Sequence, residues 1–150
     1  MKQYIIDGNN LICKLPSLKI LQTKDKQGSR EKLAFIIDNY LNQRNTKAFL
    51  HFDGHPKEPI RINNASIIYS ENLSADEKIK NQVGRSKNPR NIIVVTSDNN
   101  LTEYARVCSS TVIKCEEFVK DILHQKDNDE EKRRIEEMSN NEEFKKLFGI

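Results

Sequence analysis

The chain has 150 residues, of which 36% are hydrophobic and 31% charged, a composition that suits one compact, ordinary globular domain. No apolar run approaches the roughly 18 residues that cross a bilayer, and the first residues lack the pattern of a signal peptide. We therefore expect a cytoplasmic protein without a membrane partner. The net charge of +3 is compatible with a polyanionic partner but decides nothing alone. Three cysteines, without a C-x-x-C pair, argue against a disulfide framework and indicate reduced, partly buried thiols.

The first half of the chain predicts three strands and one helix. Lys2–Ile6 has a strand-like pattern and ends at the polar run Asp-Gly-Asn-Asn. A helix is predicted over Arg30–Arg44, because apolar residues recur there at helical spacing, with Ser29 as its N-cap. Thr46–Phe52 and the short apolar segment Ser66–Tyr69 are predicted as strands, separated by a loop that contains two prolines.

The second half continues the alternation of strands and helices. Ser74, three residues before a glutamate, has the form of a capping box and opens a helix through about Val83. The basic loop Gly84–Asn91 leads to the clearest buried strand, Ile92–Val95. The remaining predicted elements are a helix after Asp98 to about Val107, a strand over Thr111–Lys114 and a helix over Glu116–His124. This alternation predicts an α/β fold, a three-layer sandwich around a mostly parallel central sheet.

Two regions differ in charge. Residues 1–125, which form the expected α/β domain, are net basic, and residues 126–150 are net acidic. The final segment is predicted as a charged helical extension that packs on the same domain. Its charge run indicates a solvated helix face, with docking to a protein partner as the alternative.

Four aspartates stand where predicted strands end or where helices begin. Asp7, Asp53 and Asp98 follow three of the strands, and Asp76 lies in the first turn of a helix. Parallel strands bring their carboxyl ends to one edge of the sheet, so we expect these acids to gather there. Clustered carboxylates repel one another unless a cation neutralises them, and Mg²⁺ and Mn²⁺ prefer carboxylate and water oxygens. The pattern predicts a site for Mg²⁺ or Mn²⁺ that activates water against a phosphodiester.

Each acid also has a purely structural interpretation. Asp7 and Asp98 could cap the helices that follow them. Asp53 begins an Asp-Gly turn pair, and Asp76 could simply stabilise the N-terminus of its helix. The shared edge, rather than any single acid, carries the prediction.

Three segments resemble NYN domains of the PIN-like nuclease superfamily. Tyr4–Ile12 (YIIDGNNLI) resembles the opening motif of these domains, Ser74–Ile79 (SADEKI) their central A-D-x-x-I motif, and Val94–Asp98 (VVTSD) their late T-S-D strand end. Order and spacing agree with the YacP-like branch over about residues 2–125. The resemblance implies a PIN-like fold, a divalent metal and RNA hydrolysis without a covalent enzyme intermediate.

The resemblance also implies roles for individual residues. The positions that match metal-binding, catalytic acids are Asp7, Asp76 and Asp98. Asp53 ends the matching second strand and is a further candidate ligand. Asn10 matches a catalytic residue that would orient a metal-bound water or a phosphate. Asn9 stands where the family usually has an aromatic residue, a change that could alter contacts with the substrate.

Contacts with RNA are predicted for the basic residues and hydroxyls near these motifs. The basic loop contributes Arg85, Lys87 and Arg90, the segment after the opening motif contributes Lys14 and Lys19, and Thr96 and Ser97 adjoin Asp98. The cations would neutralise phosphates, and the hydroxyls would hydrogen-bond the scissile phosphate or nearby waters. A solvated surface loop is the alternative for the Arg85 group.

These features together predict a metal-dependent endoribonuclease, a hydrolase that acts on RNA. The resemblance makes mRNA the candidate substrate and the ribosome a candidate partner. A catalytically silent module that binds RNA or the ribosome is one alternative, and a metal-dependent phosphatase is another. The sequence leaves the oligomeric state open.

Other kinds of site are disfavoured. His51, Asp53 and His55 alternate as zinc ligands on a strand would, but Gly54 and Pro56 interrupt the extended chain there. The sequence contains neither glycine-rich phosphate-binding motif, so we expect no nucleotide cofactor.

Overall fold

Five strands form one central sheet in the computed structural model, which describes the backbone of residues 1–147 and the side chains of residues 1–135. The strands are β1 (Lys2–Asp7), β2 (Thr46–Phe52), β3 (Ser66–Tyr69), β4 (Ile92–Val95) and β5 (Thr111–Ile113). Their order is β3-β2-β1-β4-β5, and all four neighbouring pairs are parallel. The predicted α/β fold with a parallel central sheet is confirmed, and β1 lies at its centre.

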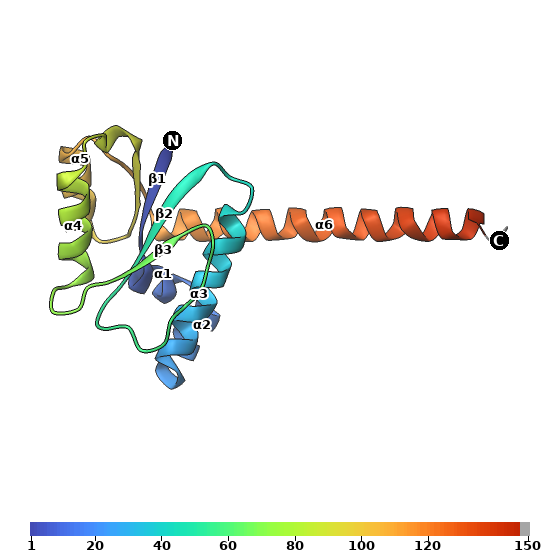
Figure 1. Ribbon diagram of the computed structural model, residues 1–150, viewed down its shortest axis with the longest axis horizontal. Helices are drawn as coiled ribbons and strands as arrows, with labels where there is room; N and C mark the ends of the chain where they lie inside the picture. The colour runs from blue at the N-terminus through green and yellow to red at the C-terminus, as the bar shows by residue number, and fades with distance from the viewer. Residues whose placement is uncertain (148–150) are drawn as a thin grey trace. The chain divides into compact units, whose positions relative to one another are not determined.

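Helices cover both faces of this sheet. They are α1 (Gly8–Lys14), α2 (Pro16–Lys24), α3 (Lys26–Leu41), α4 (Ala75–Arg85), α5 (Asn99–Val107), α6 (Cys115–Leu147) and the short 3-10 helix η1 (Pro89–Asn91). Figure 1 shows α4 and α5 on one side of the strands and α3 on the other, which gives the three layers. Among the described residues, no helix is long and apolar enough to cross a membrane.

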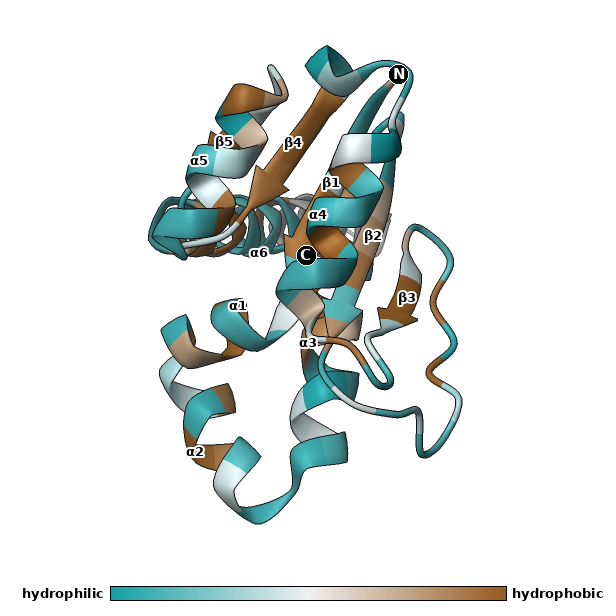
Figure 2. Ribbon diagram, turned by 90° about the vertical axis from the view of Figure 1, so that its left-hand side faces the viewer, coloured by the Kyte–Doolittle hydropathy of each residue, from teal (hydrophilic) through white to brown (hydrophobic). Residues whose placement is uncertain are grey.

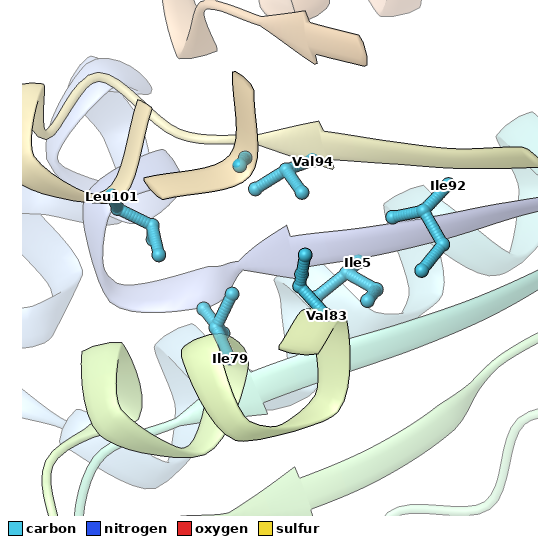
Figure 3. Close-up of a cluster of buried hydrophobic side chains, with 7 residues drawn as sticks. Ile5, Ile79, Val83, Ile92, Val94 and Leu101 are labelled. Carbon is cyan, nitrogen blue, oxygen red and sulfur yellow. The ribbon is translucent and has the colours of Figure 1, made fainter. Parts of the chain in front are cut away.

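The face beneath α4 and α5 holds one compact apolar cluster. Ile5 of β1 packs there with Ile79 and Val83 of α4 and with Leu101 of α5 (Figure 3). The spacing of four residues between Ile79 and Val83 puts both on the same side of α4. β4 is buried at all four positions, as expected for an inner strand of a parallel sheet, and is apolar throughout in Figure 2.

The opposite face is closed by aromatic side chains. Tyr4 precedes Ile5 on β1, so its side chain points to the other face of the sheet. Its ring lies 6.0 Å from the ring of Phe118, which in turn meets Tyr40 of α3 edge-on at 5.1 Å between centroids. Phe118 belongs to the first turn of α6, so this helix start is part of the domain core.

Two helices near the N-terminus, α1 and α2, were not expected from the sequence pattern. α1 follows β1 without a connecting loop, because the side chain of Asp7 accepts a hydrogen bond from the backbone N–H of Asn10 and caps the helix. α2 begins at Pro16. Proline lacks a backbone N–H, but the first N–H groups of a helix have no partner within it, so no helical hydrogen bond is lost. These helices have 7 and 9 residues, too few for a helical period to stand out.

Helix α3 begins four residues earlier than predicted, so the assignment of Ser29 as its N-cap was wrong. Asp25 is the cap, and its side chain accepts a hydrogen bond of 2.9 Å from the backbone N–H of Gly28. Ser29 is fully buried within the helix, and its hydroxyl donates back into the preceding turn. The helix ends at Leu41, three residues before the predicted Arg44.

Helix α6 joins the predicted last helix of the domain and the predicted extension into one element. The chain divides into two compact units, Met1–Val119 and Lys120–Ile150, and α6 begins in the first unit. The predicted packing of residues 126–150 on the domain stays a prediction, and the end of that segment lies outside the described residues.

Gly8 is expected to tolerate no side chain. A Cβ at this position would lie 2.6 Å from the carbonyl oxygen of His51 and 2.7 Å from the ring of Phe52. We expect Gly8→Ala to lower the free energy of unfolding by about 1–3 kcal/mol, as overpacking does. Gly84→Ala is the matched control, because its Cβ would meet only the movable hydroxyl of Tyr104 and alanine favours the helix. Equal denaturation midpoints for Gly8→Ala and wild type in urea would contradict this expectation.

Candidate active site

A pocket of about 290 Å³ lies at the carboxyl edge of the sheet. The acids that line it are Asp7, Asp53, Asp76 and Asp98. Asp7 ends β1 and Asp98 follows β4, the two strands between which the connections change direction across the sheet. Open α/β sheets bind their ligands at this switch point. The structure therefore brings together the four acids that the sequence analysis selected.

Asp7 is the most buried of these acids, with 4% of its surface exposed. Its Oδ1 accepts from the backbone N–H of Asn10 at 3.4 Å, and its Oδ2 accepts from the hydroxyl of Thr96 at 3.3 Å. Burial raises the pKa of Asp7 to about 6, and the charges of Asp76 and Asp53 act in the same direction. The two hydrogen bonds only partly offset this rise, so a positive charge nearby would stabilise the ionised form of Asp7.

Thr96 links Asp7 to Asp98. It is fully buried at the end of β4, and its Oγ1 accepts a hydrogen bond of 3.1 Å from the backbone N–H of Asp98 while donating to Asp7. Asp98 caps α5 by accepting from the N–H of Leu101 at 2.9 Å. The contact between Thr96 and RNA stays a prediction; here the hydroxyl is buried and bonded to the carboxylate of Asp7 and the backbone N–H of Asp98.

Asp53 is held by hydrogen bonds on every side. Its Oδ1 accepts from the backbone N–H of Ala75 at 2.8 Å, and its Oδ2 accepts from the amide of Asn9 at 3.0 Å. Its own backbone N–H donates to Oδ1 of Asn9 at 3.2 Å. Its carbonyl accepts from the guanidinium of Arg30, which is buried and lies 5.4 Å from the centre of the Phe52 ring.

Asp76 is the second residue of α4 and is half-buried. Desolvation raises its pKa, and the charges of Asp98 and Asp53 raise it further, against an opposing effect of Lys80. Ser74 caps the helix by accepting from the backbone N–H three residues on, at 3.1 Å, which confirms the predicted helix start. The cap thus sets the turn on which Asp76 faces the other acids.

The lining of the pocket fits a hard cation. Besides the carboxylates it includes Asn10, whose Oδ1 is buried and has no hydrogen-bond partner among the described residues. Within the described part of the chain, no three His, Cys, Asp or Glu side chains are arranged to hold one ion by themselves. Mg²⁺ is commonly bound through one or two carboxylates, with waters and substrate phosphates completing its shell. The donor set suits that mode of binding rather than an all-protein cage.

Glu116, in the first turn of α6, is a further residue at this edge that sequence reasoning missed. Lys14 forms an ion pair with it at 3.0 Å, and the hydroxyl of Ser97 donates to it at 2.9 Å. Hydrogen bonds from its own backbone N–H, Lys14 and Ser97 lower the pKa of Glu116 to about 2. The acid follows the carboxyl end of β5, so the edge rule that selected the aspartates would have found it as well.

The basic loop lies away from the acids. Arg85 ends α4, and Arg90 belongs to η1, which immediately precedes β4. α4 runs back along the sheet for 11 residues, or about 16 Å at the usual rise. Arg85, Lys87 and Arg90 are exposed at the amino edge, whereas the pocket is at the carboxyl edge; in Figure 2 the start of β4 and α1 lie at opposite ends of the sheet. Lys19 is exposed on α2.

The alternating histidines do not share one face of a strand. His51 is buried, and its Nε2 lies 2.7 Å from Oε1 of Gln82 on α4. β2 ends at Phe52, and Gly54 then takes a left-handed φ of 85°, which turns the chain. His55 lies beyond this turn and is exposed. His51, Asp53 and His55 therefore do not lie on one extended strand, as the zinc site considered above would require.

The three cysteines are unpaired, as predicted. Cys13 lines the pocket and is exposed, whereas Cys115 is buried. Burial raises the pKa of Cys115 to about 12, which keeps it a neutral thiol at physiological pH.

Comparisons with known proteins agree on one family and one fold. A family model described as a YacP-like NYN domain matches residues 4–148. A crystal structure of a mutant of Rae1 (YacP) from Bacillus subtilis has a TM-score of 0.77 at 22% identity, covering 93% of this chain and 85% of that one. A second Rae1 (YacP) crystal structure from Bacillus subtilis has a TM-score of 0.73 at 20% identity, with 98% and 87% covered. No curated protein matches the chain. At these identities the likeness concerns the fold.

The burial of Asp7 predicts a distinctive dependence of stability on pH. The folded-state pKa of about 6 exceeds the reference value of 3.8, so the folded state binds this proton more tightly and stability falls as pH rises between those values. Asp7→Asn removes this loss. Without divalent cations, we expect it to raise the free energy of unfolding at pH 7.5 by up to about 3 kcal/mol, and to bring no gain below about pH 4.

Urea denaturation at the two pH values measures this difference. Glu103→Gln, at an exposed carboxylate on α5, is the control and should match wild type at both. A variant Asp7→Asn that is less stable than wild type at pH 7.5 would show that the hydrogen bonds of the ionised carboxylate outweigh its burial.

Proposed function

The chain belongs to the YacP-like NYN domain family, and on this basis we propose that it is a divalent-metal-dependent endoribonuclease. Membership of this family indicates a nuclease-like function related to RNA. The observation that carries the finer proposal is the pocket, where four carboxylates meet at the switch point of the sheet. We propose RNA as the substrate, with mRNA on cytoplasmic ribosomes as the candidate form.

Asp7, Asp76 and Asp98 would share the binding of one or two Mg²⁺ or Mn²⁺ ions, each held by at most two of these carboxylates. The buried Oδ1 of Asn10 would be a further oxygen donor, and waters and substrate phosphates would complete the shell. Such an ion, when bound, activates a water and stabilises charge on the phosphate. The raised pKa values of Asp7 and Asp76 support this proposal, because a cation would offset the burial, and the repulsion between acids, that now favour their protonated forms.

Other residues of the chain orient these carboxylates through hydrogen bonds. Thr96 and the N–H of Asn10 orient the carboxylate of Asp7, and the N-cap bond to Leu101 orients that of Asp98. These bonds exist before any substrate arrives, so little reorganisation is required on binding. Ser97, half-buried beside Asp98, keeps its hydroxyl on Glu116. The predicted contact of Ser97 with a phosphate would require its hydroxyl to leave Glu116 and donate to the phosphate instead.

The charge of the pocket also explains why RNA would need the cation. RNA phosphates approaching four carboxylates meet repulsion, which a bound divalent ion reverses. Two basic side chains close to this edge are already engaged: Lys14 is paired with Glu116, and Arg30 donates to the carbonyl of Asp53. The cation would therefore provide substrate binding as well as chemistry.

The proposal predicts that cleavage depends on Asp98. Labelled single-stranded RNA is incubated with Mn²⁺ or Mg²⁺, with EDTA added in a parallel sample. Asp98→Asn keeps an oxygen for the N-cap bond to Leu101 but removes the charge. We expect it to cut at least about 100-fold more slowly, because several kcal/mol of charge stabilisation are lost. Glu103→Gln on the same helix should cut like wild type.

Two outcomes would contradict the proposal. RNA binding without cleavage by wild type, on free RNA and on translating ribosomes alike, would indicate a catalytically silent binding module. Hydrolysis of a generic phosphomonoester without any cutting of RNA would indicate a phosphatase that uses the same acids.

The basic loop is expected to act on long RNA only, since it lies at the opposite edge. Replacing Arg85, Lys87 and Arg90 together by glutamine should reduce the magnitude of the salt slope for a long single strand by about 2, at roughly 0.7 per phosphate contact. Cleavage of an oligonucleotide that fills only the pocket should be unchanged. Replacing Lys132, Arg133 and Arg134 of α6 by glutamine removes the same number of exposed charges and is the matched control. An unchanged slope in the triple variant would remove the loop from the RNA-binding surface.

A further inference from the structure

We propose that Asp53 is a positioning residue rather than a metal ligand: paired with Asn9, it fixes the start of α4 and thereby places Asp76 in the pocket. This inference rests on the proposed function for the role of Asp76. Both carboxylate oxygens of Asp53 are engaged by donors of this chain at 3.0 and 2.8 Å, shorter than the 3.4 and 3.3 Å of the two bonds to Asp7.

The pairing of Asn9 with Asp53 is reciprocal. The amide of Asn9 donates to Oδ2 of Asp53 at 3.0 Å, and its oxygen accepts from the backbone N–H of Asp53 at 3.2 Å. Both donor and acceptor of one side chain are thus used on one residue, across 44 positions of sequence. This joins the first turn of α1 to the end of β2.

The other oxygen of Asp53 holds the start of α4. It accepts at 2.8 Å from the N–H of Ala75, the first residue of that helix. The first N–H groups of a helix have no partner within it, and a carboxylate there is stabilised by a charge-assisted bond and by the helix dipole. Ala75 is buried and adjoins Asp76 directly. A shift of this N–H would carry Asp76 with it.

The backbone of Asp53 is anchored independently of its side chain. The buried guanidinium of Arg30 donates to its carbonyl, and the N–H of Gly54 donates to the hydroxyl of Ser70 at 2.9 Å. Because these bonds fix the main chain of Asp53, its carboxylate is held in place where it accepts from the start of α4. The charge of Asp53 is therefore met by the N-terminus of α4 and by the amide of Asn9.

A pair of exchanged substitutions separates positioning from ligation. The double variant Asn9→Asp/Asp53→Asn moves the carboxylate to position 9 and keeps all three hydrogen bonds. The new carboxylate accepts from the backbone N–H and from the new amide of position 53, whose oxygen still accepts from Ala75. In Asp53→Asn alone, the amide NH₂ groups of positions 9 and 53 face each other, so the bond between the two side chains is lost. In Asn9→Asp alone, two carboxylates face each other and repel.

Two readouts are measured on the full chain. Amide hydrogen exchange of Ala75 and the first turn of α4, without metal, reports the positioning. Mn²⁺ titration by calorimetry reports the site. We expect each single variant to lose roughly tenfold or more in protection of Ala75 and about 10–100-fold in Mn²⁺ affinity, as loss of a supporting residue does. The double variant should recover both to within about threefold of wild type.

Asp76→Asn is the control that separates the readouts, because it should lose Mn²⁺ binding while Ala75 stays protected. Recovery of protection in the double variant without recovery of Mn²⁺ affinity would overturn the inference and make Asp53 a ligand. Failure to recover protection would overturn it as well. If wild type binds no Mn²⁺, the proposed function fails, and the exchange measurements still decide whether the pair holds α4.

Discussion

The burial of one carboxylate, that of Asp7 at the end of the central strand, is the constraint on which the rest of the site depends. A buried charge is unfavourable unless hydrogen bonds or a cation compensate it. Asp7 receives two bonds: the one from the N–H of Asn10 also caps α1, and the one from the hydroxyl of Thr96 adjoins the bond by which Thr96 holds the N–H of Asp98 in the turn after β4. The same bonds that make the burial tolerable therefore shape the walls of the pocket.

The charges around this carboxylate are distributed unequally. Asp53 and Glu116 are each matched by partners of the chain itself, a helix N-terminus and amide for the first and a lysine for the second. Asp7 and Asp76 keep raised pKa values because burial and neighbouring acids outweigh their partners. An imbalance of this kind within an otherwise well-satisfied edge is characteristic of a functional site.

Much of the fold and the set of acids could be predicted from the sequence. The buried run Ile92–Val95 and the short segments around it indicate strands, and the capping box at Ser74 indicates α4. The acids Asp7 and Asp98 were found because parallel strands must end at a common edge. The sequence pattern failed where a helix was short or where two residues could each serve as its N-cap. α1 and α2 have too few turns to show a period, and Ser29 competed with Asp25 as a cap.

The sequence by itself thus determined which acids reach one edge, because strand direction and chain order follow from local patterns and simple topology. The tertiary structure alone decided what each acid does there. The bonds of Asp53 to Asn9 and of Glu116 to Lys14 join segments far apart in the chain, so no local pattern encodes them. The same holds for the basic loop at Arg85, which adjoins the Asp76 helix in sequence but lies a helix length away in space. Burial and partner geometry depend on the packed whole, and these set the pKa of Asp7 and the orientation of each carboxylate.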